Sequence, residues 1–177
     1  MSPLYLGLVG SCRFKRAPMD VADLIKQCDV IVYALPTRNP YRVKIGQVLL
    51  AKKPMSETVI ELSVPPPKKP GELEYGLISP IQQTSILFLR RPNPGKFVWQ
   101  RVNYYYDLIS MKNDHTPSTF YEDYDYSAKK QISYLMVGNL VTFPPSLNRK
   151  YCGYATRADI AKEVNRIYRT QAVGKHR

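Results

Sequence analysis

The chain has few of the side chains on which most catalytic and metal sites depend. Only two histidines occur in its 177 residues, His115 and His176, although histidine is the side chain most often used for acid–base chemistry near neutral pH. The sequence has no glycine-rich phosphate loop, no nucleophile elbow, and no cluster of histidine, cysteine and carboxylate at metal-ligand spacing. We therefore expect a protein that is not an enzyme and uses no cofactor or metal.

Cysteine is scarce, and long apolar runs are absent. Cys12, Cys28 and Cys152 lie far apart and match no zinc motif. Their odd number, together with the lack of a secretory signal, predicts free and mostly buried thiols in a reducing compartment. No stretch approaches the roughly 18–20 apolar residues of a membrane-spanning helix, so any contact with a membrane should be peripheral.

Acidic residues are in the minority. Lysine and arginine number 26 against 14 acids, which gives a net charge of +12. Such an excess predicts attraction to polyanions, that is, to nucleic acid, a nucleoprotein or an anionic membrane. The length and the 44% hydrophobic composition fit one globular domain over residues 1–177.

Two stretches have the periodicity of amphipathic helices. In the first, which follows Asp20, the apolar residues at helical spacing are Val21, Leu24, Ile25 and Cys28. The second begins at Thr156, which together with Asp159 resembles a capping box. Its apolar stripe consists of Ile160, Val164, Ile167 and Tyr168.

Alternating or continuous apolar segments predict the strands. These segments are residues 4–8, 30–35, 41–50 with a bulge at Gly46, 58–64, 84–89, 97–109 and 131–143. Residues 111–130 carry several acids and little apolar periodicity, which predicts a mobile acidic loop. Helices and strands together indicate an α+β protein.

Basic residues gather in the predicted loops and along one strand, where they are candidates for binding a membrane or a nucleocapsid. They are Arg13, Lys15, Arg16, Arg38, Arg42, Lys44, Lys52, Lys53, Lys68, Lys69, Arg90, Arg91 and Lys96. Projecting from one side of a sheet, they would form a binding patch. Spread evenly over the surface, they would only raise solubility.

Aromatic residues follow the basic turn at residues 90–96. They are Phe97, Trp99, Tyr104, Tyr105 and Tyr106. Side chains of this kind stack on the bases of single-stranded nucleic acid. In a strand, alternating aromatic residues more often fill a core or a cross-strand ladder.

The stretch from Met19 to Leu50 resembles the start of the globular domain of rhabdovirus matrix proteins. In that family a short helix opened by Asp-Val-Ala is closed by an aspartate, and an apolar strand leads to an arginine, a proline and an aromatic residue. The matching residues are Asp20, Val21, Ala22, Asp29, Arg38, Pro40 and Tyr41, with a second likeness at Arg90, Arg91 and Pro92.

The resemblance implies a twisted antiparallel β-sheet with two or three packed helices. It also implies a structural protein of the virion, under the envelope, that occurs in the host cytoplasm and at membranes. Such a protein self-associates and bridges the viral nucleocapsid and an anionic membrane. In the family an extended segment of one subunit docks on the next. The candidates here are the N-terminus, with Leu4 and Tyr5, and the loop 111–130, with Phe120 and Tyr121.

The chain also departs from the animal-virus members of the family. It starts almost directly at its first predicted strand, without a lysine-rich arm, and Leu147 follows Pro144-Pro145-Ser146 where a budding motif has tyrosine. This form is similar to a plant-infecting, cytorhabdovirus-like member. The rival hypothesis is a basic single-stranded nucleic-acid-binding protein of the viral movement or silencing-suppressor type, and a third is a ribosome-associated protein.

Overall fold

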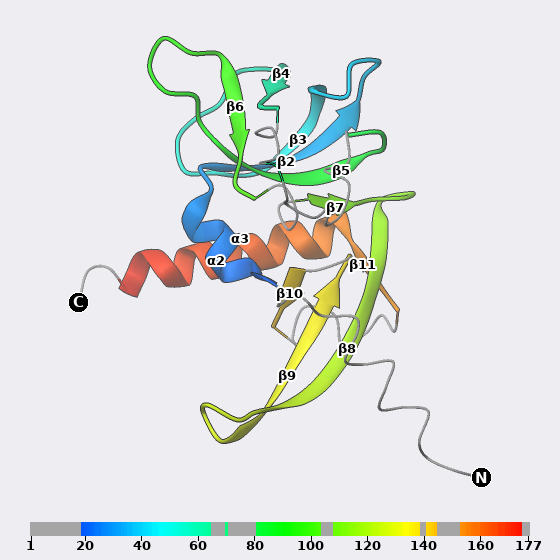
Figure 1. Cartoon of the computed structure of the whole chain (residues 1–177), viewed down its shortest axis with the longest axis vertical. Helices are drawn as coiled ribbons and strands as arrows, with labels where there is room; N and C mark the ends of the chain where they lie inside the picture. Colours follow the sequence, from blue (N-terminus) through cyan, green and yellow to red (C-terminus); the bar gives the residue numbers. More distant parts are fainter. Residues whose placement is uncertain are drawn as a thin grey trace.

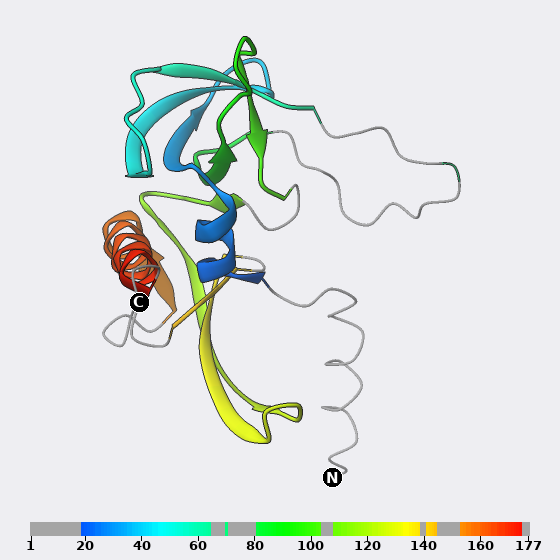
Figure 2. The ribbon, with the colours of Figure 1, turned by 90° about the vertical axis from the view of Figure 1, so that its left-hand side faces the viewer.

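The computed structural model describes residues 19–64, 70, 81–103, 108–138, 141–144 and 153–174. In these ranges the chain is an α+β single domain with two helices, a five-stranded mixed sheet and a small five-stranded β-barrel. The helices lie between the barrel and the mixed sheet (Figures 1 and 2). The elements in chain order are β1 (Met19–Asp20), α2 (Val21–Gln27), β2 (Val30–Pro36), β3 (Arg42–Ala51), β4 (Val59–Leu62), β5 (Ser85–Arg90), β6 (Val98–Arg101), β7 (Leu108–Ser110), β8 (His115–Asp125), β9 (Lys130–Val137), β10 (Val141–Phe143), β11 (Tyr154–Thr156) and α3 (Arg157–Val173).

The barrel is a closed ring of strands. β2, β3 and β4 are antiparallel neighbours, β6 pairs in parallel with β4 and antiparallel with β5, and β5 pairs back with β2. β7 extends the sheet beyond β5. The bulge at Gly46 is confirmed, because Tyr33 pairs with Gln47 while Ala34 pairs with Ile45.

β2 and β5 are buried on both faces and separate the two hydrophobic cores. Val30, Val32 and Ala34 of β2 fill the barrel, whereas Ile31 and Tyr33 belong to the core beside the helices. β5 alternates between the two cores in the same way. A strand covered on both sides has apolar residues at every position, which explains the continuous apolar runs of these two segments.

The second sheet has the order β1-β10-β9-β8-β11, and it is mixed because β1 runs parallel to β10. The architecture therefore differs from the single twisted antiparallel sheet that the resemblance implies. The physical reason is that β2 and β5 are apolar on both faces. A single sheet with helices on one side would leave the other face of these two strands exposed to water, whereas closure into a barrel buries it.

The first helix has the predicted buried face. Asp20 is the N-cap of α2, with its carboxylate accepting a hydrogen bond from the backbone N–H of Ala22 at 2.7 Å. Val21, Leu24 and Ile25 are fully buried. The negative side chain at the N-cap satisfies an N–H group that has no partner within the helix.

The second helix begins at the predicted capping box. The Thr156 side chain accepts from the N–H of Asp159, and the Asp159 carboxylate accepts from the N–H of Thr156. The predicted apolar stripe is confirmed. Ile160, Val164 and Ile167 are buried, and Tyr168 is partly buried. Two side chains join the helix to its neighbours: the Asn165 amide donates to the Leu49 carbonyl oxygen at 2.7 Å, and Gln171 donates to that of Ala22 at 2.9 Å.

The prediction of a mobile loop at residues 111–130 is wrong. This segment contains β8, a turn and the first residue of β9, and the two strands pair from Ser118 opposite Val137 to Asp125 opposite Lys130. Polar composition misleads here because most of this hairpin is exposed on both faces. A strand without a buried face needs no apolar alternation.

Two long predicted strands are divided in the structure. Residues 97–109 contain β6 and β7, and residues 131–143 contain β9 and β10. The second break comes at Gly138, whose φ of 64° lies in the left-handed region that glycine adopts without strain. The predicted strand at residues 4–8 lies outside the described residues.

A polar cluster joins the barrel to the second sheet and α3. The Tyr33 hydroxyl donates to Oδ1 of Asp114 at 2.7 Å, and the Arg157 guanidinium donates to Oδ2 at 3.0 Å while lying over the Tyr33 ring. Burial, reinforced by Asp114, raises the pKa of Tyr33. Asp114 holds a φ of 61° in the turn before β8, where aspartate is tolerated better than most residues.

The separation of the two cores by β2 and β5 predicts that two phenylalanines contribute very differently to stability. Phe88 is fully buried, whereas Phe97 is 86% exposed. We expect Phe88→Ala to lower the free energy of unfolding by about 3–5 kcal/mol. Phe97→Ala should change it by less than about 0.5 kcal/mol. Urea unfolding followed by the fluorescence of Trp99 measures both, and equal effects of the two substitutions would contradict the assignment of the cores.

Candidate functional site

The described residues contain no group of three or more histidine, cysteine, aspartate or glutamate side chains that could hold a metal ion. His115, at the start of β8, has Nδ1 3.0 Å from the carbonyl oxygen of Asn113 and its ring 5.4 Å from that of Tyr154. These contacts are those of a packed turn residue. His176 lies outside the described part of the chain.

Cys28 follows α2 and is a buried thiol. It is 1% exposed, and its Sγ donates to the carbonyl oxygen of Ile25 at 3.6 Å. Burial raises the pKa of the Cys28 thiol to about 12, and the opposing effect of Lys52 is smaller. Because the thiolate is the nucleophile and the metal ligand, Cys28 is chemically inert near neutral pH.

Four exposed basic residues of the barrel lie on one outer surface. β3, β4 and β6 are neighbours there, with Arg42 opposite Glu61 and Glu61 beside Val98. Side chains alternate across each strand, so one set fills the barrel and the other faces outward. The name barrel face is used here for eight exposed residues of these strands and of the turns that precede β3 and β6, namely Arg38, Arg42, Lys44, Val59, Glu61, Lys96, Phe97 and Val98.

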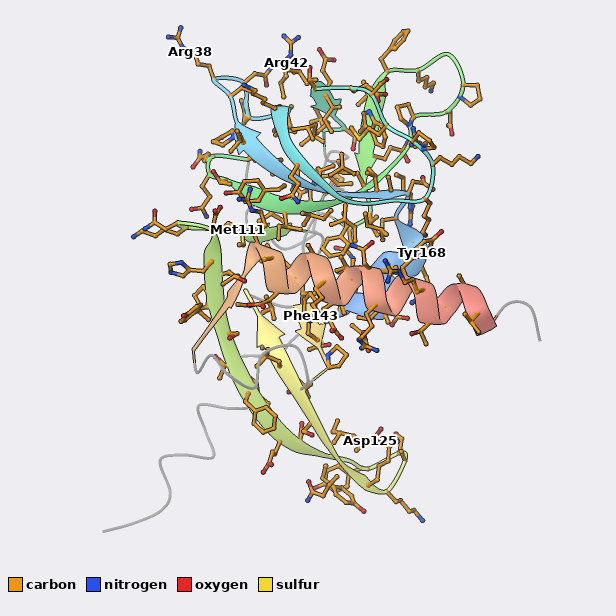
Figure 3. The ribbon with its side chains drawn as sticks, turned by 180° about the vertical axis from the view of Figure 1, so that it is seen from behind. Arg38, Arg42, Met111, Asp125, Phe143 and Tyr168 are labelled. Atoms are coloured by element: carbon orange, nitrogen blue, oxygen red, sulfur yellow. The ribbon has the colours of Figure 1, made fainter. Side chains whose placement is uncertain are left out.

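The barrel face carries four cations and one carboxylate. Arg38 and Arg42 lie at the end of the molecule that is farthest from the β8–β9 turn (Figure 3). None of the four cations forms a salt bridge with any described residue. Phe97 adds an exposed ring beside Lys96. This surface combines unpaired positive charge with apolar contact area.

Two of the predicted binding residues hold the end of α2. Nζ of Lys52 donates to the carbonyl oxygens of Ile25 at 2.6 Å and Lys26 at 3.2 Å. Nε of Arg90 donates to the carbonyl oxygen of Gln27 at 3.1 Å. The last carbonyl groups of a helix have no partner within it and attract cations. The side chains of Lys52 and Arg90 therefore stabilise the helix end.

A third predicted binding residue, Arg91, fastens the loop after β3 to the barrel. Its guanidinium donates to the carbonyl oxygens of Lys53 and Pro54 and lies 5.3 Å from the ring centroid of Trp99. Its backbone N–H donates to Asp29 at 2.9 Å. Trp99 is 1% exposed, so it is a core residue and offers no stacking surface. Lys53 itself is exposed.

α3 carries a second basic surface on the side opposite its buried stripe. Lys162, Arg166 and Arg169 recur at helical spacing and are exposed. Arg166 donates to the carboxylate of Glu163, which raises the pKa of the guanidinium. Lys162 and Arg169 have no salt-bridge partner among the described residues. These three residues are called the helix stripe.

The β8–β9 hairpin projects beyond the rest of the second sheet (Figures 1 and 2). β11 pairs only with residues 115–117 of β8, and β10 pairs only with residues 135–137 of β9. From residue 119 to residue 134 the hairpin is thus a two-stranded ribbon among the described residues. This segment, residues 119–134, is called the arm.

The arm exposes aromatic side chains. Phe120 is 53% exposed, Tyr121 is 38% exposed, and Tyr126 in the turn is 83% exposed. Tyr121 stacks on Tyr134 across the two strands, with the ring centroids 5.5 Å apart. Phe120 and Tyr121 are predicted self-association residues, whereas Tyr126 and Tyr134 were missed because their segment reads as a polar loop.

The predicted site residues thus fall into separate groups. Arg38, Arg42, Lys44 and Lys96 come together on the barrel face, while three others support the fold. The other predicted residues lie outside the described part of the chain, and they are Arg13, Lys15, Arg16, Lys68, Lys69, Leu4 and Tyr5. In the sequence, the helix stripe occupies the side of the amphipathic helix opposite the apolar residues, but nothing in the sequence shows how this side lies relative to the barrel.

The fold and these surfaces define a basic α+β protein with two exposed cationic surfaces and a two-stranded arm. Comparisons with protein-family models, with curated proteins and with solved structures give no match. None of the described helices is long and apolar enough to cross a membrane.

The raised pKa of Cys28 predicts how this thiol reacts. In a Cys12→Ser/Cys152→Ser variant, which keeps Cys28 alone, a disulfide reagent should leave the folded protein unlabelled at about pH 8 and label it fully in denaturant. Rapid labelling of the folded protein would contradict the burial of this thiol.

The same shift makes stability depend on pH. Because the folded pKa of about 12 lies above the ordinary value of 9.0, the contribution of Cys28 to stability is complete below pH 9.0 and is lost as the pH rises toward 12. Urea unfolding at a series of alkaline pH values measures this loss. Cys28→Ala should have a flatter profile, and an unchanged profile would overturn the prediction.

Proposed function

We propose that the protein is a matrix-type structural adaptor without enzymatic activity, which self-associates and bridges a nucleocapsid and an anionic membrane. The observation that carries this proposal is the presence of two separate groups of exposed cations among the described residues, the barrel face and the helix stripe. A molecule that joins two polyanionic bodies needs two such surfaces. Its place would be under the envelope of a virion and in the host cytoplasm and membranes during assembly.

The charges are sufficient for weak binding at a membrane. Each basic residue close to an anionic membrane contributes about 1 kcal/mol. The barrel face holds four cations, and the helix stripe holds three, one of which is paired. Binding by either surface alone is then weak, and self-association strengthens it by presenting several copies at once.

The resemblance to rhabdovirus matrix proteins also supports the proposal. Its residues lie on α2, β2 and β3, where Asp20 caps the helix and Asp29 holds the backbone of Arg91. Arg38 projects from the turn between β2 and β3 on the barrel face. Two of the residues that carry the resemblance, Asp20 and Asp29, therefore make hydrogen bonds that stabilise this part of the fold, and a third, Arg38, is an exposed cation available to a partner.

A specific observation favours a second candidate, binding of single-stranded nucleic acid by the barrel. If the barrel strands β2 to β6 are numbered 1 to 5 along the chain, their order around the ring is 1-2-3-5-4. The third and fifth strands, β4 and β6, are parallel. OB-fold barrels share this order and bind oligonucleotides on the second and third strands and the adjoining turns. The barrel face has the same location. Its one strongly exposed ring among the described residues is Phe97.

Three double substitutions that remove equal charge separate the two candidates. Arg42→Ala/Lys44→Ala changes the barrel face, and Lys162→Ala/Arg169→Ala changes the helix stripe. Lys26→Ala/Lys112→Ala is the control, because both lysines are exposed and lie outside the two surfaces and the arm. The assay is flotation of anionic liposomes mixed with labelled single-stranded RNA, which floats only if the protein bridges the two.

For the adaptor, wild-type protein and the control should carry RNA upward with the liposomes, and each of the other two variants should carry much less. RNA binding without flotation would overturn the adaptor and favour the second candidate. In that case only the barrel-face variant should weaken RNA binding, and the slope of log K against log salt should fall by about 1.4 for the two lost contacts.

A further inference from the structure

The turn of the arm presents one tyrosine far more openly than any other in the described part of the chain. Tyr126 is 83% exposed, whereas the next most exposed described tyrosine, Tyr154, is 40% exposed. The turn follows Asp125, which in Figure 3 lies at the end of the molecule opposite Arg38 and Arg42. We propose that Tyr126 is a phosphorylation site, modified by a tyrosine kinase that recognises the acidic strand before it.

The contacts of Tyr126 differ from those of other tyrosines in the described ranges. Tyr33 is buried, and its hydroxyl is engaged in a hydrogen bond of 2.7 Å. Tyr121 and Tyr134 stack on one another across the two strands of the arm. The hydroxyl of Tyr126 makes no hydrogen bond with a described residue, and its ring packs edge-on against Tyr124 with the centroids 5.0 Å apart. The oxygen of Tyr126 is therefore accessible to the active site of an enzyme.

The charge immediately before Tyr126 is opposite in sign to the charge of the whole chain. Glu122, Asp123 and Asp125 occupy three of the four preceding positions, in a chain of net charge +12. None of these carboxylates forms a salt bridge with a described residue. Charge patterns around the target residue are a common basis of kinase specificity. The strand before Tyr126 thus fits an enzyme whose substrate groove is cationic, because complementary charge steers and orients the encounter.

The backbone before Tyr126 has the form in which an enzyme groove can hold it. β11 pairs with β8 only at residues 115–117, so no described strand covers the outer edge of β8 beyond this range. An unpaired edge can form backbone hydrogen bonds with another chain. After Tyr126 the chain turns, and the Asp125 carboxylate accepts hydrogen bonds from the N–H groups of Ser127 and Ala128. Because a two-stranded hairpin is marginally stable in water, this turn can open locally without unfolding the rest of the protein.

The modification is a phosphoryl transfer from ATP to Tyr126. The phenolic oxygen bonds to the γ-phosphorus while the bond between that phosphorus and the β–γ bridging oxygen breaks, so that ADP leaves and the phenolic proton passes to a base of the kinase. The arm has a net charge of −1, from three acids against two lysines. A phosphate ester adds about −1.5 to −2 and brings this charge to about −3. Phosphorylation thus creates an anionic end, repelled by membranes and nucleic acids, on a molecule whose opposite end is cationic.

Phosphorylation of the full-length folded protein tests the site. The probe is a purified cytoplasmic tyrosine kinase with a cationic substrate groove, supplied with Mg²⁺ and ATP, and mass spectrometry of peptides locates the phosphate. Tyr126 should be modified first and should carry most of the phosphate, and Tyr126→Phe should remove most of the incorporation. Glu122→Gln/Asp123→Asn should lower kcat/KM for modification of Tyr126 roughly 10-fold, because two favourable charge contacts with the enzyme are lost.

Asp23→Asn/Glu57→Gln is the matched control, because it removes one aspartate and one glutamate charge at exposed positions outside the arm. This variant should be phosphorylated at the same rate as wild type, and circular dichroism checks that all variants are folded. Phosphate found mainly on another tyrosine, or equal rates for the two charge-neutralised variants, would overturn the site. Neither result changes the bridging of RNA to liposomes expected of the unmodified protein, so this test is independent of the proposed function.

Discussion

β2 and β5 bury both of their faces, and the rest of the structure depends on this. One face of each strand closes the barrel around Trp99, and the other supports α2 and α3. Side chains of a strand alternate strictly between its two faces, so a shift of register by one residue would move every side chain into the other core. The barrel and the helical layer are thus fixed relative to one another by the same two strands, and the polar cluster of Tyr33, Asp114 and Arg157 secures the edge of this contact.

The arm follows from the same arrangement. The core beside the helices ends at residues near the base of β8 and β9, among them Leu135 and Val137. Beyond this base the hairpin has no described apolar layer to pack against. Its polar composition therefore suits a ribbon in water or at an interface with another chain, and its tyrosine stack lends it local order.

Positive charge in this protein has two different uses. Lys52, Arg90 and Arg91 satisfy carbonyl groups at the end of α2 and in the loop after β3. The cations of the barrel face and the helix stripe remain exposed and give the molecule its attraction to polyanions. Burial and hydrogen bonding, rather than the residue type, separate the two uses. For this reason a list of basic residues read from the sequence overstates the size of the binding surface.

The sequence by itself determined both helices with their buried faces, the cap at Asp20, the capping box at Thr156, the bulge at Gly46 and four of the barrel strands. These features depend on neighbours within a few residues, where periodicity and hydrogen-bond chemistry suffice. Only the tertiary structure decided that the strands close into a barrel, that residues 111–130 form a hairpin and that four cations share one face. Those outcomes depend on contacts between segments far apart in the chain, and a polar strand exposed on both faces leaves no pattern that distinguishes it from a loop.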